Sequence, residues 1–145
     1  PEYAHQLADS TYLELANSFL CKALLDESSG DFAGAAWSQI HAAWACDDAE
    51  RDGPAKTCRT NAAGMVRKAL ENGQQISGQE GAETAIQVDL LRRSGRLNEA
   101  RQMIQTQRPA ITEDIILKIL AFQETLIAVG DEACHTISEG LRENE

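Results

Sequence analysis

The sequence predicts an all-α protein, and three observations support this prediction. Prolines occur only at positions 1, 54 and 109, so residues 55–108 contain none and can form long helices. Apolar residues recur at spacings of three and four, which is typical of amphipathic helices, and the strict alternation of a strand is absent. The chain has 22 alanines, whose small side chains let helices pack closely. Its 145 residues suffice for a buried core, and we expect one domain over 1–145.

The best-defined helix follows the turn at Gly30-Asp31 and extends to about Arg51. It carries both tryptophans on one stripe with spacings of four, three and four, formed by Ala33, Trp37, Ile40 and Trp44. We expect both indoles to be largely buried against the helices before and after it. Alanines beside this stripe allow those helices to approach closely.

Six further helices follow from the turn and capping signals between apolar stripes. Asp9-Ser10 supplies N-cap residues for the first, Pro54 fits the first turn of the third, and Pro109 separates the fifth from the sixth. The motif Ser77-x-x-Glu80 resembles a capping box ahead of the fourth. The expected ranges are about 9–28, 54–73, 80–94, 97–107, 112–129 and 132–141.

Charge is distributed unevenly along the chain. The net charge is −10, with −8 in residues 1–50, +4 in 51–108 and −6 in 109–145. The acidic total argues against nucleic acid as the main partner, because phosphate binding requires a basic field. No apolar run approaches the roughly 20 residues that span a bilayer, and no signal-peptide pattern is present, so we expect no membrane partner. Because the chain begins with Pro rather than Met, we expect a fragment of a longer chain.

Four cysteines and three histidines raise the question of a metal site or a thiol nucleophile. Helical zinc ligands lie four residues apart, whereas His41 and Cys46 are five apart. Cys134 and His135 are adjacent in sequence, which is not the arrangement of a nucleophile and its base. We therefore expect no metal, no cofactor and no catalytic residue. We expect reduced, mostly buried cysteines in a cytoplasmic protein.

Three turns of the chain are alike. They are Gly30-Asp31-Phe32 before Ala35, Gly95-Arg96-Leu97 before Ala100, and Gly130-Asp131 between two further helices. Their separations of 65 and 35 residues fit a helical hairpin of about 34 residues, or twice that length. In these turns the chain resembles the tetratricopeptide-repeat family. The resemblance implies about seven antiparallel helices stacked as hairpins in a right-handed superhelix or bundle, and binding of protein segments in a helical groove.

Two charged clusters are candidate partner-binding sites. The denser one is basic and consists of Arg92, Arg93, Arg96 and Arg101. It can form a solvated face, supply internal ion pairs, or clamp an acidic peptide or carboxylate. The second contains Asp47 and Asp48, which oppose the helix dipole near a helix C-terminus. Pairing with Arg51, Lys56 or Arg59 is the structural alternative to a functional role for these carboxylates.

We therefore expect a protein–protein interaction or scaffolding module rather than an enzyme. The expected partner is a protein or peptide, with an acidic segment favoured, and self-association stays open. Two other functions also stay open. The chain can be a helical appendage of an enzyme whose active site lies upstream, or an RNA-binding domain that uses the basic middle. Acid–base or metal motifs upstream would support the first, and salt-dependent binding of random RNA would support the second.

Overall fold

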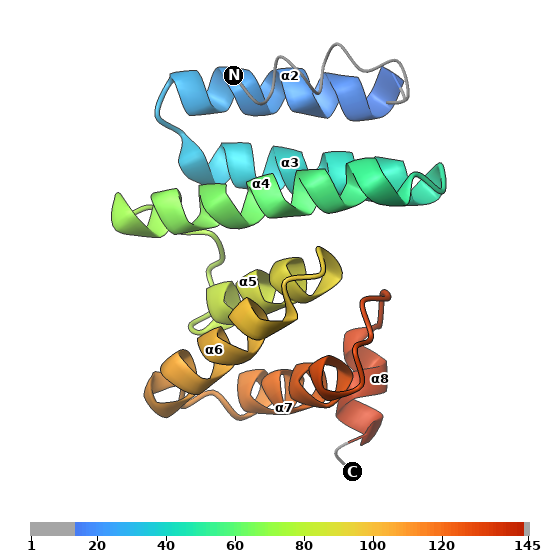
Figure 1. Cartoon of the computed structure of the whole chain (residues 1–145). Coiled ribbons are helices and arrows are strands. Elements are labelled where there is room, and N and C mark those ends of the chain that lie inside the picture. Colours follow the sequence, from blue (N-terminus) through green and yellow to red (C-terminus); the bar gives the residue numbers. More distant parts are fainter. Residues whose placement is uncertain (1–13, 144–145) are drawn as a thin grey trace. The chain divides into compact units, whose positions relative to one another are not determined.

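The fold is all-α, as the sequence predicts. A computed structural model describes residues 14–143, and these residues contain seven α-helices, one short 3-10 helix and no strand (Figure 1). The helices are α2 (Glu14–Ser28), α3 (Phe32–Asp48), α4 (Asp52–Glu71), α5 (Ala82–Arg93), α6 (Leu97–Gln107), η1 (Arg108–Ala110), α7 (Asp114–Ala128) and α8 (Ile137–Glu143). No helix within this range is long and apolar enough to cross a membrane. The tetratricopeptide-like stacking stays a prediction.

Most helix boundaries lie within two residues of the predicted ones, and α6 matches the predicted range. The expected start of the first helix near Asp9 lies outside the described residues. The tryptophan helix ends three residues earlier than expected, at Asp48. Glu50 there takes a left-handed conformation with φ of 58°, and the Arg51 N–H donates to the Cys46 carbonyl at 2.8 Å. These two features satisfy a terminal carbonyl and stop the helix.

The capping box is found at a different helix from the predicted one. Ser77-x-x-Glu80 does not cap α5, because the Ser77 hydroxyl accepts from the Gln79 N–H and α5 has Gly81 at its N-cap. The capping box instead precedes α8, where Thr136 and Glu139 bond reciprocally. The Glu139 N–H donates to the Thr136 hydroxyl at 3.1 Å, and the Thr136 N–H donates to the Glu139 carboxylate at 3.2 Å. The last helix therefore begins at Ile137 rather than 132.

The chain divides into two compact units, one ending at Ile76 and the other beginning at Ser77. The prediction of a single domain over 1–145 stays a prediction. In the first unit α3 packs against both α2 and α4 (Figure 1). Its core consists mainly of small side chains, namely Ala16, Leu20, Ala42, Ala43, Ala45, Cys46, Ala55 and Cys58. Small residues at this contact let the helix backbones approach closely.

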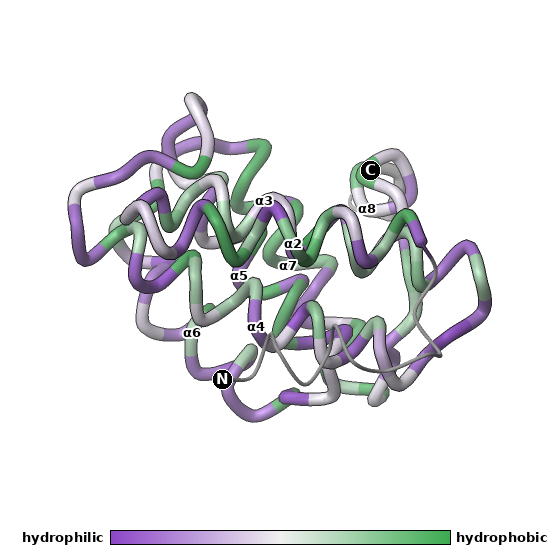
Figure 2. The backbone as a smooth tube through the Cα atoms, turned by 90° about the horizontal axis from the view of Figure 1, so that it is seen from above, coloured by the Kyte–Doolittle hydropathy of each residue, from purple (hydrophilic) through white to green (hydrophobic). Residues whose placement is uncertain are grey.

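The tryptophans do not both enter this core. Trp44 is 48% exposed and Trp37 is partly buried, so the prediction that both are largely buried was wrong for Trp44. The reason is that α3 has apolar residues on nearly all of its sides. Hydrophobic and hydrophilic positions are interspersed along the helices, as the hydropathy-coloured tube shows (Figure 2). The closely packed side is the one that carries Ala35, Ala42 and Cys46. A large indole does not fit where the backbones are this close.

The loop after α4 returns to the N-terminus of α3 and closes the first unit. The Gln74 side chain accepts from the Ala33 N–H at 3.0 Å and donates to the Gly30 carbonyl at 2.7 Å. Asp31 caps the same helix by accepting from the Gly34 N–H at 2.9 Å. One glutamine therefore satisfies an unpaired helix N–H and holds two segments together that are 41 residues apart in sequence.

The second unit is built around α5, which packs against α6 and α7. Its apolar core includes Val88, Ala100, Ile104 and Leu120, all fully buried. The short helix α8 packs on α7 and closes the unit at its C-terminal end (Figure 1). The turn after α5 contains Gly95, whose φ of 86° is a conformation that favours glycine.

Replacing Gln74 should destabilise the first unit. We expect Gln74→Ala to lower the free energy of unfolding by about 1–2 kcal/mol, because two partly buried hydrogen bonds are lost. The measurement is urea denaturation followed by tryptophan fluorescence. Gln75→Ala is the matched control, since Gln75 is the exposed neighbour and should change stability by less than about 0.5 kcal/mol. Equal effects of the two variants would contradict the role of Gln74.

Candidate functional site

Arg92, the first of the predicted partner-binding arginines, lies inside the second unit and is 0% exposed. Its Nε donates to the Gln123 side-chain oxygen at 2.6 Å, and Nη1 donates to the Asp131 carbonyl at 2.6 Å. Its Nη2 donates to the Asp89 carboxylate at 3.2 Å. The Gln123 amide also donates to Asp89 at 3.1 Å. Each of the three guanidinium nitrogens thus donates a hydrogen bond within the fold, and no exposed surface is left for a partner.

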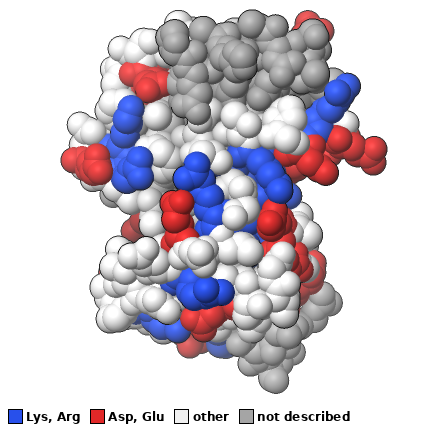
Figure 3. Space-filling view, in the orientation of Figure 1, with Lys and Arg blue, Asp and Glu red and all other residues white. Residues whose placement is uncertain are grey.

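The other three arginines of the predicted cluster lie nearer the surface. Arg93 is partly buried, while Arg96 and Arg101 are exposed. Arg96 pairs with Glu99 at 3.2 Å, one turn along α6. Most basic atoms visible in Figure 3 border acidic ones. The structure therefore does not bring the four guanidinium groups to one surface, and exposed pairs of this kind contribute little to stability.

Asp47 and Asp48 have different environments although they are adjacent. Asp47 forms a two-point ion pair with Arg59 of α4, with one oxygen 3.0 Å from Nη1 and the other bonded to Nη2. Arg59 is only 3% exposed, so this pair joins α3 to α4 from within the fold. The cation offsets the unfavourable position of Asp47 near a helix C-terminus. Asp48 is exposed, and the structure shows no ion pair for it among the described residues.

Both tryptophans, which the sequence predicts in the core, belong to a group of aromatic rings on α2 and α3. We name Phe19, Trp37, His41 and Trp44 the aromatic ridge. The ring centroids of His41 lie 5.1 Å from Trp44, 5.2 Å from Phe19 and 6.4 Å from Trp37. The Trp37 N–H donates to the Ile76 carbonyl at 3.0 Å, which fixes that indole. Trp44 is 48% exposed at the end of the ridge.

Two exposed residues lie one helical turn from members of the aromatic ridge. Leu15 is 58% exposed one turn before Phe19 on α2, and Asp48 is exposed one turn after Trp44 on α3. Exposed apolar side chains mark sites of interaction when they form a contiguous surface. The ridge could have been found from the sequence by treating the alanine side of α3 as the packed side.

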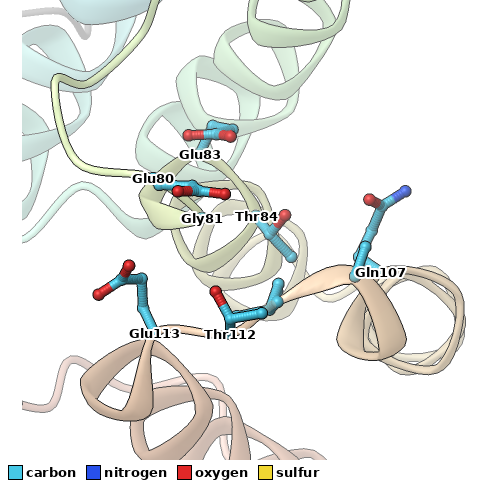
Figure 4. Close-up of a pocket in the computed structure, with 9 residues that line it drawn as sticks. Glu80, Gly81, Glu83, Thr84, Gln107, Thr112 and Glu113 are labelled. Carbon is cyan, nitrogen blue, oxygen red and sulfur yellow. The ribbon is translucent and has the colours of Figure 1, made fainter.

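A pocket of about 140 Å³ lies in the second unit, between the start of α5 and the start of α7 (Figure 4). Its lining includes Glu80, Gly81, Glu83, Thr84, Gln107, Ala110, Ile111, Thr112 and Glu113. Two of these carboxylates flank the first residues of α5, and the third is the N-cap residue of α7. Acidic side chains are favoured at helix N-termini by the helix dipole. The fold thus accounts for these carboxylates without a ligand.

Two buried cysteines contact each other across α3 and α4. The Cys58 thiol hydrogen-bonds to Cys46, which lowers the pKa of Cys46 and raises the pKa of Cys58; burial raises the pKa of Cys58 further. Both side chains are at most 1% exposed, so a substrate has no access to the sulfur atoms. The other two cysteines, Cys21 and Cys134, are exposed, which corrects the expectation of mostly buried thiols. All four are free thiols.

Comparison with known proteins adds no assignment to this geometry. The chain matches no family model, and neither a curated protein nor a solved structure is significantly similar to it. Within residues 14–143, no three or more His, Cys, Asp or Glu side chains are grouped so that they could hold a metal ion.

Removing the buried guanidinium group of Arg92 should destabilise the second unit more than removing an exposed guanidinium group does. Arg92→Met should lower the free energy of unfolding by about 3 kcal/mol, because the buried partners of Arg92 lose their hydrogen bonds. Water can still solvate the Asp89 carboxylate, which limits the loss. Arg101→Met is the matched control and should change stability by less than about 0.5 kcal/mol. Thermal or chemical denaturation followed by circular dichroism measures both. A small effect at Arg92 would mean that the buried contacts contribute little.

Proposed function

We propose that this chain is a non-catalytic protein-interaction module and that the aromatic ridge is its main contact surface. The observation that carries the proposal is the 48% exposure of Trp44, whose ring packs against His41. Tryptophan is among the residues that contribute most to binding energy at protein interfaces. An exposed indole with a fixed neighbour loses little conformational freedom when a partner covers it.

The scaffold beneath the ridge supports this role. Trp37 is held by the Ile76 carbonyl, and His41 is surrounded by three other rings. Rigid surfaces of this kind bind with a smaller entropic cost than mobile loops. The α2–α3 pair, joined at Gly30-Asp31, is also the part that we propose to be a tetratricopeptide-like hairpin, which would present the ridge beside a helical groove.

The partner that fits this surface best is a protein segment with large apolar side chains. Asp48 lies one turn beyond Trp44 and is exposed, so a basic residue in that segment would find a carboxylate beside the indole. The arginine cluster offers less support for an acidic partner, because Arg92 is buried and Arg96 already pairs with Glu99. The four free cysteines favour a reducing compartment, and we propose a cytoplasmic location on this basis.

The test is a peptide selection on the purified full chain. Peptides from a random displayed library are selected for binding, and their Kd values are measured by calorimetry. We expect Trp44→Ala to raise Kd at least about 30-fold, which corresponds to about 2 kcal/mol. Leu25→Ala, which removes a 69% exposed apolar side chain elsewhere on α2, should change Kd less than about threefold. Selected peptides that bind Trp44→Ala as tightly as the parent chain would contradict the proposed surface.

Two further measurements separate the alternatives. Sedimentation of the chain alone shows whether a second copy occupies the ridge, in which case self-association should be lost in Trp44→Ala. Binding that weakens steeply with salt and disappears in Arg93→Glu with Arg96→Glu would instead place the contact on the arginine cluster. The ridge proposal predicts weak salt dependence, since apolar burial is the main contribution.

A further inference from the structure

A histidine lies between two carboxylates where the chain leaves α7 and enters α8. Nδ1 of His135 is 2.9 Å from a Glu139 oxygen, and Nε2 is 2.9 Å from an Asp131 oxygen. A neutral imidazole has one N–H and can donate to only one of these carboxylates, whereas the imidazolium ion donates to both. The geometry therefore suits the protonated ring. None of these three residues belongs to the aromatic ridge.

The two ion pairs of His135 hold α8 in place. Glu139 is the acidic member of the capping box at the start of α8, so its bond to His135 orients that helix. The His135 ring also lies edge-on to Phe122 of α7, with centroids 5.6 Å apart. Gly140 of α8 is buried against the Phe122 ring, since a Cβ at this position would lie 2.8 Å from Phe122 Cδ2. Phe122 is thus covered from the His135 side and from α8.

The other end of the cluster is attached to α5. Arg92 donates to the Asp131 carbonyl at 2.6 Å, and its guanidinium nitrogen is 3.9 Å from an Asp131 carboxylate oxygen. The Asp131 carboxylate also accepts from the Ala133 N–H at 2.8 Å. The charged groups linked to His135 therefore come from three elements. Asp131 in the loop and Glu139 on α8 bond to its ring, and Arg92 on α5 bonds to Asp131. Arg92 also pairs with Asp89, the Glu132 carboxylate lies beside Gly95, and α7 contributes the uncharged Phe122 at the ring.

We propose that Asp131–Leu141 is a pH-controlled latch, in which protonated His135 holds α8 on Phe122 and loss of its proton releases the helix. When His135 is neutral, only one of its ring nitrogens carries a proton. The lone pair of the other nitrogen then repels the carboxylate oxygen that it faces. Glu139 and Asp131 then lose the cation between them. Release of α8 would uncover the face of α7 that carries Phe122, which is 9% exposed in the closed form.

The directions of the pKa shifts agree with this arrangement. The bonds to Glu139 and then Asp131 raise the pKa of His135 above its ordinary 6.5. The bond to His135 lowers the pKa of Glu139, and the bond from Ala133 followed by that from His135 lowers the pKa of Asp131. A raised histidine pKa means that the stabilisation is complete below pH 6.5 and is lost as pH rises through the folded value. The carboxylates remain charged throughout that range, so the latch opens on the alkaline side.

The experiment measures hydrogen exchange of the amides in residues 137–141 of the full chain at pH 6 and pH 9, after correction for the intrinsic exchange rate. We expect the protection of α8 to fall several-fold between these pH values in the parent chain. In His135→Gln protection should be low at both, because glutamine carries no charge at either pH. His41→Gln is the matched control, as it removes a histidine of the first unit and should leave the pH response unchanged.

A second measurement needs no variant. The imidazole signals of His135 are followed by NMR over the same pH range, and their midpoint should lie above 6.5 and coincide with the midpoint of the loss of protection. Equal protection at pH 6 and pH 9 in the parent chain would overturn the proposal. So would a midpoint at or below 6.5, or a pH response that survives in His135→Gln.

Discussion

The second unit depends on a charge that has no contact with water. A buried guanidinium is tolerated only when its donors are bonded, because an unpaired charge in a protein interior is too costly. Arg92 meets this requirement with Gln123 of α7, Asp89 of its own helix and the Asp131 carbonyl. These partners fix the rotation of α7 relative to α5 and the path of the chain after α7. The position from which α8 starts is thus set by a residue on α5.

The first unit contains a comparable constraint. Arg59 on α4 is 3% exposed and forms a two-point ion pair with Asp47 at the end of α3. This ion pair explains why α3 tolerates an acid where its dipole disfavours one. It also orients α3 about its own axis, since Asp47 must face α4. The rest of the helix follows from that orientation, with alanines and Cys46 turned inward and Trp44 turned outward.

The sequence predicted the helices well because their signals are local. Glycine turns, prolines and spacings of three and four depend on neighbouring residues, and α6 was predicted with its observed bounds. The environments of the candidate site residues could not be predicted, because burial is not local. Arg92 and Arg96 have the same charge in sequence, but only Arg92 lies opposite Gln123. The stripe that contains Trp44 did not show which side of α3 faces the core, because this helix is apolar on nearly all sides.

In the function that we propose, binding and stability depend on different residues. The core of the first unit is formed largely by small side chains, and the same unit contains one buried arginine, Arg59, so the large aromatic groups of α3 are not all needed for packing. Trp44 retains half of its surface, although a smaller polar residue there would avoid exposing an indole to water. An exposed indole is a cost to solubility that folding does not require. The partner contact that we propose would offset this cost, because it would cover the indole.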